Sequence, residues 1–442
     1  MLRFRRIAVV LLVLATLMAT SLPLLAQDSQ NEVKLVVFGP STWDTWAPGT
    51  GEETVNSVTE QIDSGFMAEN PYVVEITHDA RGTVADGLSR LMTTQMAGEQ
   101  IDLIMCAANP LNTSYQPRRL VLPVDDLVPV VKDRLIDGAL DPFTIDGQVW
   151  GIPISGVSAT TFFYNKTMFD NLGIKPPATY EEFLQVAAVL RDNDIIPVLH
   201  QGKNPWMWPI WYMGAIAQTT GNTQLEKTRS NLRGDTKFTD EADVKAMELV
   251  RKFVDDGILD PTSMDYDEEG MRGAFISGQA GAYFGATWDL AILTASITDF
   301  ELGIFMYPQL PDVPGHPVAY GGVEVGLCIS STISDDNLAA AKAYIEYASR
   351  PEIAAIDLMP TNPIATSHKD VLGLDTPIAQ QVREEYFPTE LFLDWIWPRE
   401  LTDTIQRQIQ EVVAGSVSPQ EAMENIQKEF DRMVDEGYEY PY

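Results

Sequence analysis

The sequence predicts an α/β protein of two lobes, each a mostly parallel sheet flanked by helices, joined by hinge crossings. Three observations predict this class. Short apolar strands alternate with amphipathic helices, the alternation resumes in a second block, and no low-complexity linker separates the two blocks. A chain of 442 residues is also too long for one ordinary hydrophobic core.

The N-terminus has the layout of a secretory signal peptide over residues 1–26. Three arginines precede an apolar stretch, and small Ala26 precedes polar residues, so we expect cleavage after Ala26. The alternative is an uncleaved anchor, because residues 7–26 are about long enough to span a bilayer. The residue directly after Ala26 is Gln27 and not a cysteine, so lipidation is not expected. We therefore expect a periplasmic or otherwise extracytoplasmic protein.

The first block reads as three strands separated by two helices. In chain order these are strand 33–38, helix 53–69, strand 73–76, helix 85–97 and strand 101–106. Asn70-Pro71 ends the first helix, since the residue before a proline resists helical geometry. This β-α-β-α-β order predicts parallel strands covered by helices.

The second block repeats the alternation over a longer stretch. Its expected elements are strand 161–164, helix 180–192, strand 195–199, helices 241–255 and 268–276, strand 280–285, strand 323–329 and helix 337–349. Residues 398–435 are expected to be helical, apart from a break at 414–416.

The composition is strongly acidic. The formal net charge is −33, and loss of residues 1–26 would make it −36, because that segment holds three arginines and no acids. Such a chain is repelled by nucleic acid and by anionic membrane surfaces, so no nucleic-acid partner is expected. The only cysteines, Cys106 and Cys328, lie in apolar strands of separate sequence regions. Buried thiols are the expected state, although pairing stays open.

Motifs for catalysis and metal binding are missing from the sequence. The four histidines do not pair with acids at metalloprotease spacing, and no P-loop, nucleophile elbow or dinucleotide fingerprint occurs. Residues 265–270 resemble the start of a calcium loop, but Ile276 occupies the position of its bidentate glutamate. We therefore expect no catalytic residue, no metal site and no cofactor.

Tryptophans in loops are the main candidate ligand contacts. Trp43 follows the first strand, Trp206 and Trp208 lie in an Asn-Pro-Trp-Met-Trp segment, Trp288 follows strand 280–285, and Trp397 opens the C-terminal region. Loops at the carboxyl ends of such strands bind ligands. An indole face buries the C–H face of a sugar ring, while carboxylates and amides bind its hydroxyls. The alternative is that these tryptophans fill the core.

Several short motifs occur in a fixed order along the chain. They are Phe66-Met67-Ala68-Glu69-Asn70-Pro71, residues 96–104, Trp150-Gly151-Ile152-Pro153 followed by Phe163-Tyr164-Asn165-Lys166, residues 275–282, Gly321-Gly322, and the helix 339–349 ending in Arg350-Pro351-Glu352. Together they resemble the bacterial extracellular solute-binding proteins of ABC importers, of the maltose- and multiple-sugar-binding type. The pair around Trp150 and Tyr164 is the most specific. Ile101 departs from the usual proline.

The resemblance implies a periplasmic-binding-protein fold with ligand held between the lobes. It implies an N-terminal lobe of 27–156 plus about 321–365, and a C-terminal lobe of 157–320 plus about 366–442. Hinges are expected near 151–158 and 317–322, where glycine and proline punctuate the crossings.

The resemblance also assigns site residues. Trp288 would be the stacking residue of the second lobe, and Trp206 the aromatic contact after a proline. Ser158 stands where maltose-type relatives carry a glutamate, and Asn109 lies where they carry Trp and Asp, so the ligand should differ from maltose. The other candidate contacts are Trp43, Asp44, Trp208, Asp289, Tyr320, Gly322 and Trp397.

The expected function is a monomeric receptor that captures a mono- or oligosaccharide by interlobe closure and delivers it to an inner-membrane ABC permease. The first rival keeps the fold but binds another solute such as a polyamine, because indole faces and carboxylates also suit ammonium groups. The second rival is a secreted glycosidase, which needs two carboxylates facing each other across the cleft.

Overall fold

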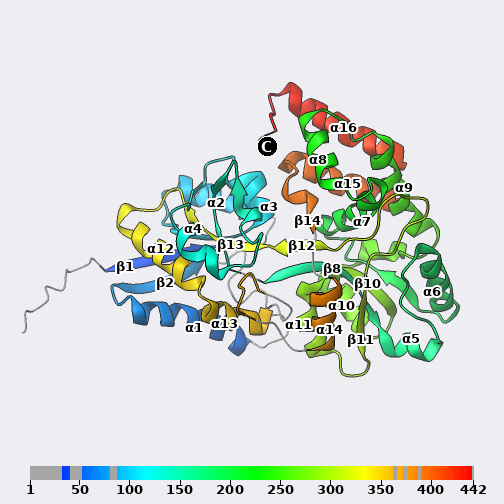
Figure 1. Cartoon of the computed structure of the whole chain (residues 1–442), viewed down its shortest axis with the longest axis horizontal. Coiled ribbons are helices and arrows are strands. Elements are labelled where there is room, and N and C mark those ends of the chain that lie inside the picture. The colour runs from blue at the N-terminus through cyan, green and yellow to red at the C-terminus, as the bar shows by residue number, and fades with distance from the viewer. Residues whose placement is uncertain are drawn as a thin grey trace, which may run out of the picture.

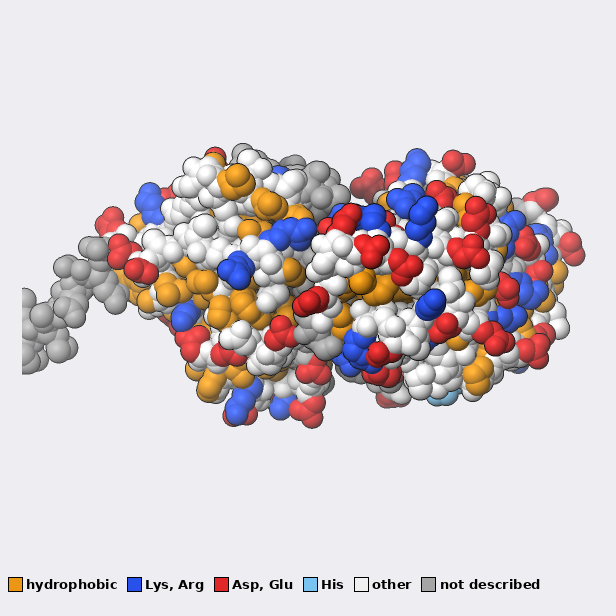
Figure 2. Space-filling model, turned by 90° about the horizontal axis from the view of Figure 1, so that it is seen from above, with side chains coloured by type: hydrophobic (Ala, Val, Ile, Leu, Met, Phe, Trp, Pro, Cys, Tyr) orange, Lys and Arg blue, Asp and Glu red, His pale blue; other side chains and the backbone are white. Residues whose placement is uncertain are grey.

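Two sheets, each covered by helices, give the molecule two lobes (Figure 1). The computed structural model describes residues 32–39, 52–79, 87–154, 156–361, 366–371, 376–386 and 390–440. From above, a waist separates the lobes, and carboxylates are scattered over both of them (Figure 2). The two-lobed α/β fold predicted from the sequence is confirmed. The expected signal peptide lies outside the described residues.

The first lobe is built on a sheet of order β2-β1-β3-β13-β4, with β7 also paired to β13. Its strands are β1 (Val33–Phe38), β2 (Val73–Asp79), β3 (Leu103–Ala107), β4 (Val121–Leu122), β7 (Ile152–Pro153) and β13 (Val325–Ser330). Helices α1 (Glu52–Glu69), α2 (Gly87–Met96), α12 (Asp335–Ala348) and α13 (Pro351–Thr361) belong to this lobe (Figure 1). Leu35, Ile62, Leu91 and Ile345 are among its fully buried core residues.

The second lobe is built on a sheet of order β14-β12-β8-β10-β9, with β11 also paired to β8. Its strands are β8 (Val157–Asn165), β9 (Ile196–Leu199), β10 (Ala280–Ala286), β11 (Leu302–Phe305), β12 (Tyr320–Val323) and β14 (Glu390–Leu391). All nine residues of β8 are buried, as expected of a central strand covered on both faces.

Ten helices of this lobe surround the second sheet in the described part of the chain (Figure 1). They are α5 (Lys166–Leu172), α6 (Tyr180–Asp192), α7 (Pro209–Thr219), α8 (Gln224–Arg233), α9 (Glu241–Asp255), α10 (Glu268–Ile276), α11 (Leu290–Ser296), α14 (Pro377–Glu385), α15 (Arg399–Ala414) and α16 (Pro419–Asp435). The bounds of α6, α9 and α10 match the sequence prediction. A capping box formed by Thr179 and Glu182 fixes the N-terminus of α6.

The expectation of mostly parallel sheets is wrong for both lobes. β1 is parallel to β2 and β3, but β13 runs antiparallel to β3, β4 and β7. In the second sheet β8 runs antiparallel to β10, β11 and β12. The reason is that β8 and β13 each enter their sheet directly from the other lobe, rather than through a helical crossover that would make them parallel.

The lobes are joined by two antiparallel segments that pair with each other. Gly322 stands opposite Ser158, and Leu327 stands opposite Ile152. The N–H of Ile154 also donates to the carbonyl of Val325 at 3.1 Å. We call residues 152–154 and 156–159 together with 321–327 the interlobe ribbon. The ribbon overlaps the expected hinge segment 151–158 and shares residues 321–322 with the expected segment 317–322.

The two cysteine-bearing strands are neighbours, contrary to their separation in the sequence. β3 and β13 pair antiparallel, with Cys106 opposite Gly326 and the buried Cys328 opposite Ile104. The pairing arises because the chain returns to the first lobe through the interlobe ribbon. Sequence distance alone gave no hint of it.

Candidate functional site

Two of the predicted tryptophans form an aromatic pair at one edge of the second sheet. Trp206 lies in the 3-10 turn Pro205–Met207 after β9, and Trp288 lies in the turn Thr287–Asp289 directly after β10. β9 and β10 are parallel neighbours, so their carboxyl ends share that edge. The ring centroids of the two indoles are 5.9 Å apart, with the planes at 50°. Trp206 is 46% exposed and Trp288 half-buried, so the pair offers an accessible aromatic surface.

The turn that carries Trp288 is held by a buried carboxylate. Asp289 is only 1% exposed. Its Oδ1 accepts from Arg272 Nε at 2.9 Å, and its Oδ2 accepts from the Tyr283 hydroxyl at 3.0 Å. Burial raises the pKa of Asp289, while Arg272 and Tyr283 act in the opposite direction. Asp289 therefore has both oxygens engaged inside the lobe, which favours a role in positioning Trp288 over direct ligand contact.

A second bond ties the Trp288 turn to the interlobe ribbon. The N–H of Ala159 donates to Thr287 Oγ1 at 3.0 Å. This contact brings the turn next to Ser158, which is 1% exposed and whose side chain interacts with the Glu324 carboxyl. Gly322, opposite Ser158, has a φ of 129° that only glycine adopts readily.

A polar cluster forms where the first lobe meets the second. The N–H of Ala108, just after β3, donates to the carbonyl of Glu324 in the interlobe ribbon at 2.8 Å. Asn109 Nδ2 donates to the backbone carbonyl of Asp394, in the turn Leu393–Trp395 of the second lobe, at 2.5 Å. The predicted Asn109 thus contacts the other lobe directly. We call Asn109, Ser158, Glu324 and Asp394 the interlobe cluster.

The two carboxyls of the interlobe cluster lie in a poorly solvated place. Burial raises the pKa of Glu324 to about 7, opposed by the Ser158 side chain and increased further by the charge of Asp394. Burial likewise raises the pKa of Asp394 to about 7. No basic side chain acts on either carboxyl in the described part of the chain, and Asp394 Oδ1 has no hydrogen-bond partner there.

Sequence reasoning missed Glu324, Asp394 and Arg272. A signal for the first two was available: each is a single acid between apolar neighbours, Val323 and Val325 in one case and Leu393 and Trp395 in the other. A lone carboxylate inside an apolar run is costly to bury, which makes it a candidate for a function. Arg272 carried no such signal, because an arginine on a helix surface is ordinary.

Three other predicted contacts lie in the core of the second lobe. Trp208 is fully buried, packs against His200 and donates from Nε1 to the carbonyl of Gly202 at 3.0 Å. The hydroxyl of Tyr320 donates to the carbonyl of Met213 at 2.9 Å. Trp397 is 1% exposed. These surroundings favour packing roles. Trp43 and Asp44 lie outside the described residues.

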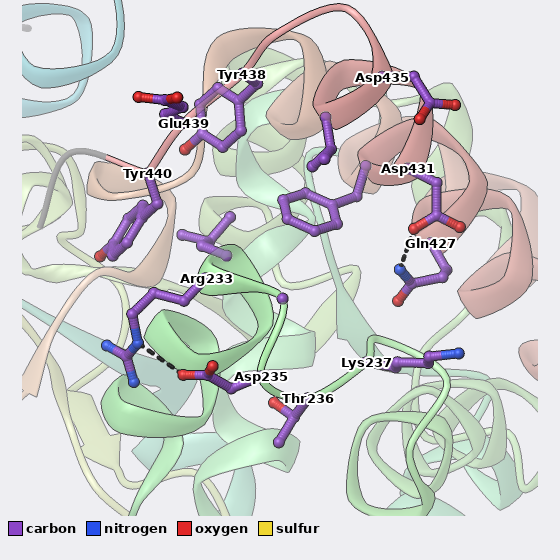
Figure 3. A pocket seen from close by; sticks show the side chains of 14 residues that line it. Arg233, Asp235, Thr236, Lys237, Gln427, Asp431, Asp435, Tyr438, Glu439 and Tyr440 are labelled. Atoms are coloured by element: carbon purple, nitrogen blue, oxygen red, sulfur yellow. Dashed lines mark hydrogen bonds and ion pairs between the residues drawn. The ribbon is translucent and has the colours of Figure 1, made fainter.

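Two surface hollows lie away from these residues. One, of about 710 Å³, lies between α8 and α16, and Figure 3 shows Arg233, Asp235 and Tyr440 on its rim. Its charged groups pair locally, as in the 2.9 Å contact of Arg233 with Asp235. The other, of about 620 Å³, lies beside Tyr164 and Tyr386. No predicted site residue lines either hollow, so the candidate site rests on the contacts between the lobes.

Among the described residues, no three His, Cys, Asp or Glu side chains come together in a way that could hold a metal ion. Within the same ranges, every helix is too short or too polar to cross a bilayer.

Comparison with known proteins decides the family. Residues 61–380 match the model of the bacterial extracellular solute-binding proteins, which is well over half of the chain. The chain belongs to this family. Its relatives include a Brucella abortus protein named as a putative binding protein, 26% identical over 257 residues, and the multiple sugar-binding protein of Streptococcus mutans, 21% identical over 299 residues. These alignments cover 57% and 67% of this chain, and 60% and 69% of the relatives.

Solved structures of solute-binding proteins share the fold. A chitin oligosaccharide binding protein superposes with a TM-score of 0.77 at 22% identity, over 91% of this chain and 98% of the other. A solute-binding protein in complex with raffinose superposes with a TM-score of 0.68 at 21% identity, over 91% and 99%. The family and these neighbours are binding proteins rather than enzymes, and the family is extracytoplasmic.

Proposed function

We propose that this chain is the receptor of an ABC importer, which captures a small carbohydrate between its lobes and delivers it to an inner-membrane permease. The observation that carries the proposal is the Trp206–Trp288 pair, an accessible aromatic surface at the carboxyl edge of two parallel strands. Aromatic faces bind the C–H faces of sugar rings, and nearby polar groups bind the hydroxyls. Some relatives and structural neighbours carry names that mention sugars, which agrees with this choice.

Capture follows from a shift between open and closed forms. A ligand that touches the Trp288 turn in the second lobe and Asn109 in the first makes more contacts when the lobes are together, so it stabilises the closed form. The interlobe ribbon is the connection about which the lobes would rotate. The closed form is the one that a permease would recognise.

The cellular setting belongs to the same proposal. Residues 1–26 direct export and are removed after Ala26, which leaves a periplasmic, non-lipidated monomer. The strong negative charge keeps such a protein soluble and away from anionic surfaces.

A polyamine is the second candidate ligand, because one observation favours it. Glu324 and Asp394 are two carboxyls without a basic partner in the described part of the site, and a cationic ligand would supply one. A glycosidase is less well supported, because the family and its structural neighbours are binding proteins.

Thermal unfolding of residues 27–442 against a panel of saccharides, polyamines and amino acids tests the proposal. A ligand that binds the folded state raises the melting temperature by mass action. We expect a saccharide to raise it, to change tryptophan emission and to be recovered intact. A shift with polyamines alone would transfer the function to the second candidate.

A further inference from the structure

The interlobe cluster contains more negative charge than its surroundings compensate. Glu324 comes from the interlobe ribbon and Asp394 from a turn of the second lobe, and backbone contacts to Ala108 and Asn109 hold both at the junction. Two other buried acids of the second lobe have basic partners. Asp289 pairs with Arg272 at 2.9 Å, and Asp243 pairs with Lys227 at 3.0 Å. Glu324 and Asp394 have none among the described residues.

The unsatisfied atoms of the cluster define what is missing. Asp394 Oδ1 lacks a hydrogen-bond partner among the described residues, and the buried Ser158 hydroxyl interacts there only with the Glu324 carboxyl. Ionised carboxylates only accept hydrogen bonds, so the group that fits here must donate several. A neutral hydroxyl can donate one bond but leaves buried charge uncompensated, whereas an ammonium group donates three and neutralises charge.

We propose that Glu324 and Asp394 receive an ionised amino group of the ligand, so that the solute is an amino-bearing saccharide rather than a neutral one. This inference rests on the proposed function. The Trp206–Trp288 pair would hold a ring face, while the carboxyls and the Ser158 hydroxyl hold the amine. The neighbouring contacts agree with this division, because the Trp288 turn is bonded to Ala159, the residue after Ser158.

Matched ligands test the inference without altering the protein. Residues 27–442, which contain every described residue, are titrated calorimetrically at neutral pH with glucosamine oligosaccharides and with N-acetylated oligosaccharides of the same length. N-acetylation removes the charge and keeps the ring. We expect the amino form to bind about tenfold tighter or more, as is typical when a buried charge pair is formed.

Variants then assign the preference to the cluster. E324Q and D394N keep the side-chain size and remove the charge, so each should reduce the preference for the amino form toward unity. D435N, an exposed acid near the end of α16, is the matched control and should leave the preference unchanged.

Each outcome separates the inference from the proposed function. Equal or tighter binding of the N-acetylated form, or a preference that survives E324Q and D394N, overturns the inference and leaves a neutral-sugar receptor. Binding of spermidine but of neither saccharide overturns the carbohydrate function and supports ammonium recognition if both variants abolish it. Binding of no saccharide and no amine overturns both.

Discussion

Asp289 and Asp394 are both aspartates of the second lobe, and each is next to a tryptophan in a short 3-10 turn. Asp289 has Arg272 on one carboxylate oxygen and Tyr283 on the other. Asp394 has no basic partner and an unbonded Oδ1 among the described residues. A carboxylate with hydrogen bonds to both oxygens can hold its neighbours in place. A carboxylate with an unbonded oxygen can accept a hydrogen bond from a ligand.

The largest effect on stability is expected from replacing Asp289, the aspartate whose two carboxylate oxygens both have partners. Asp289→Ala leaves the buried Arg272 with Glu268 as its acidic partner and leaves the buried Tyr283 hydroxyl without its acceptor. We therefore expect it to destabilise the fold by about 3–5 kcal/mol, measured by urea unfolding. The double variant Arg272→Met with Asp289→Leu removes both charges and should be markedly less destabilised. Equal losses for the single and double variants would contradict the pairing.

The next effect removes the group that Asp289 positions. Trp288→Ala should weaken ligand binding by about 2–4 kcal/mol, since a half-buried aromatic anchor is lost, with little change in the melting temperature. Calorimetric titration measures the first quantity and thermal unfolding the second. Trp208→Phe, in the core, is the control and should change stability more than affinity. Unchanged affinity in Trp288→Ala would rule out the aromatic pair as the binding surface.

A smaller effect is expected in the pH dependence of stability, because Glu324 and Asp394 have no basic partners in the described part of the chain. Glu324 and Asp394 have folded pKa values of about 7, raised from 4.5 and 3.8. A raised carboxyl pKa means that the folded state holds its proton longer than the unfolded state. Stability should therefore fall as pH rises from about 4 to about 7 and stay level above that.

The size of this pH effect should be on the order of 1–3 kcal/mol per carboxyl, because both side chains keep some exposed area. Other groups also titrate in this window, so the measurement is the difference between the wild type and the double variant E324Q/D394N. A pH dependence identical in the two proteins would show that these carboxyls titrate normally.

The smallest effect is expected from Asp394→Asn alone, measured at pH 8 without ligand. The substitution removes a partly buried charge that has no partner to lose, so the free energy of unfolding should stay within about 1 kcal/mol of the wild type or rise. Asp289→Asn at the same pH should be clearly destabilised. A large loss in Asp394→Asn would mean that Asp394 has a structural partner of its own.

The sequence predicts those helices and strands whose signals lie within the element itself or directly beside it. Helix α6 could be located because the turn 176–179 opens it. Strand β1 could be located because it is rich in β-branched residues and is followed by Gly39-Pro40. Helix α7 was missed because nearly all of its residues are buried, so it has no polar face to reveal a period. The antiparallel entry of β8 was missed because strand direction depends on pairing with residues far along the chain.

The same limit applies to the site. Trp206 and Trp288 could be proposed because loop tryptophans after strands carry their own signal. Their proximity, and the difference between Asp289 and Asp394, depend on which distant residues approach them. Arg272 lies 17 residues before Asp289, and Asn109 lies 285 residues before Asp394. No pattern in one sequence gives such pairs.

The interlobe ribbon has a mechanical consequence. A pair of hydrogen-bonded strands is stiff along its length and within its plane, but it bends easily across its thin direction. We therefore expect the two lobes to rotate about a single hinge axis through the interlobe ribbon rather than slide past each other. Glu324 lies within the interlobe ribbon, close to the hinge axis, so its position changes little when the lobes rotate. A small angular change there becomes a large displacement at the outer rims of the lobes.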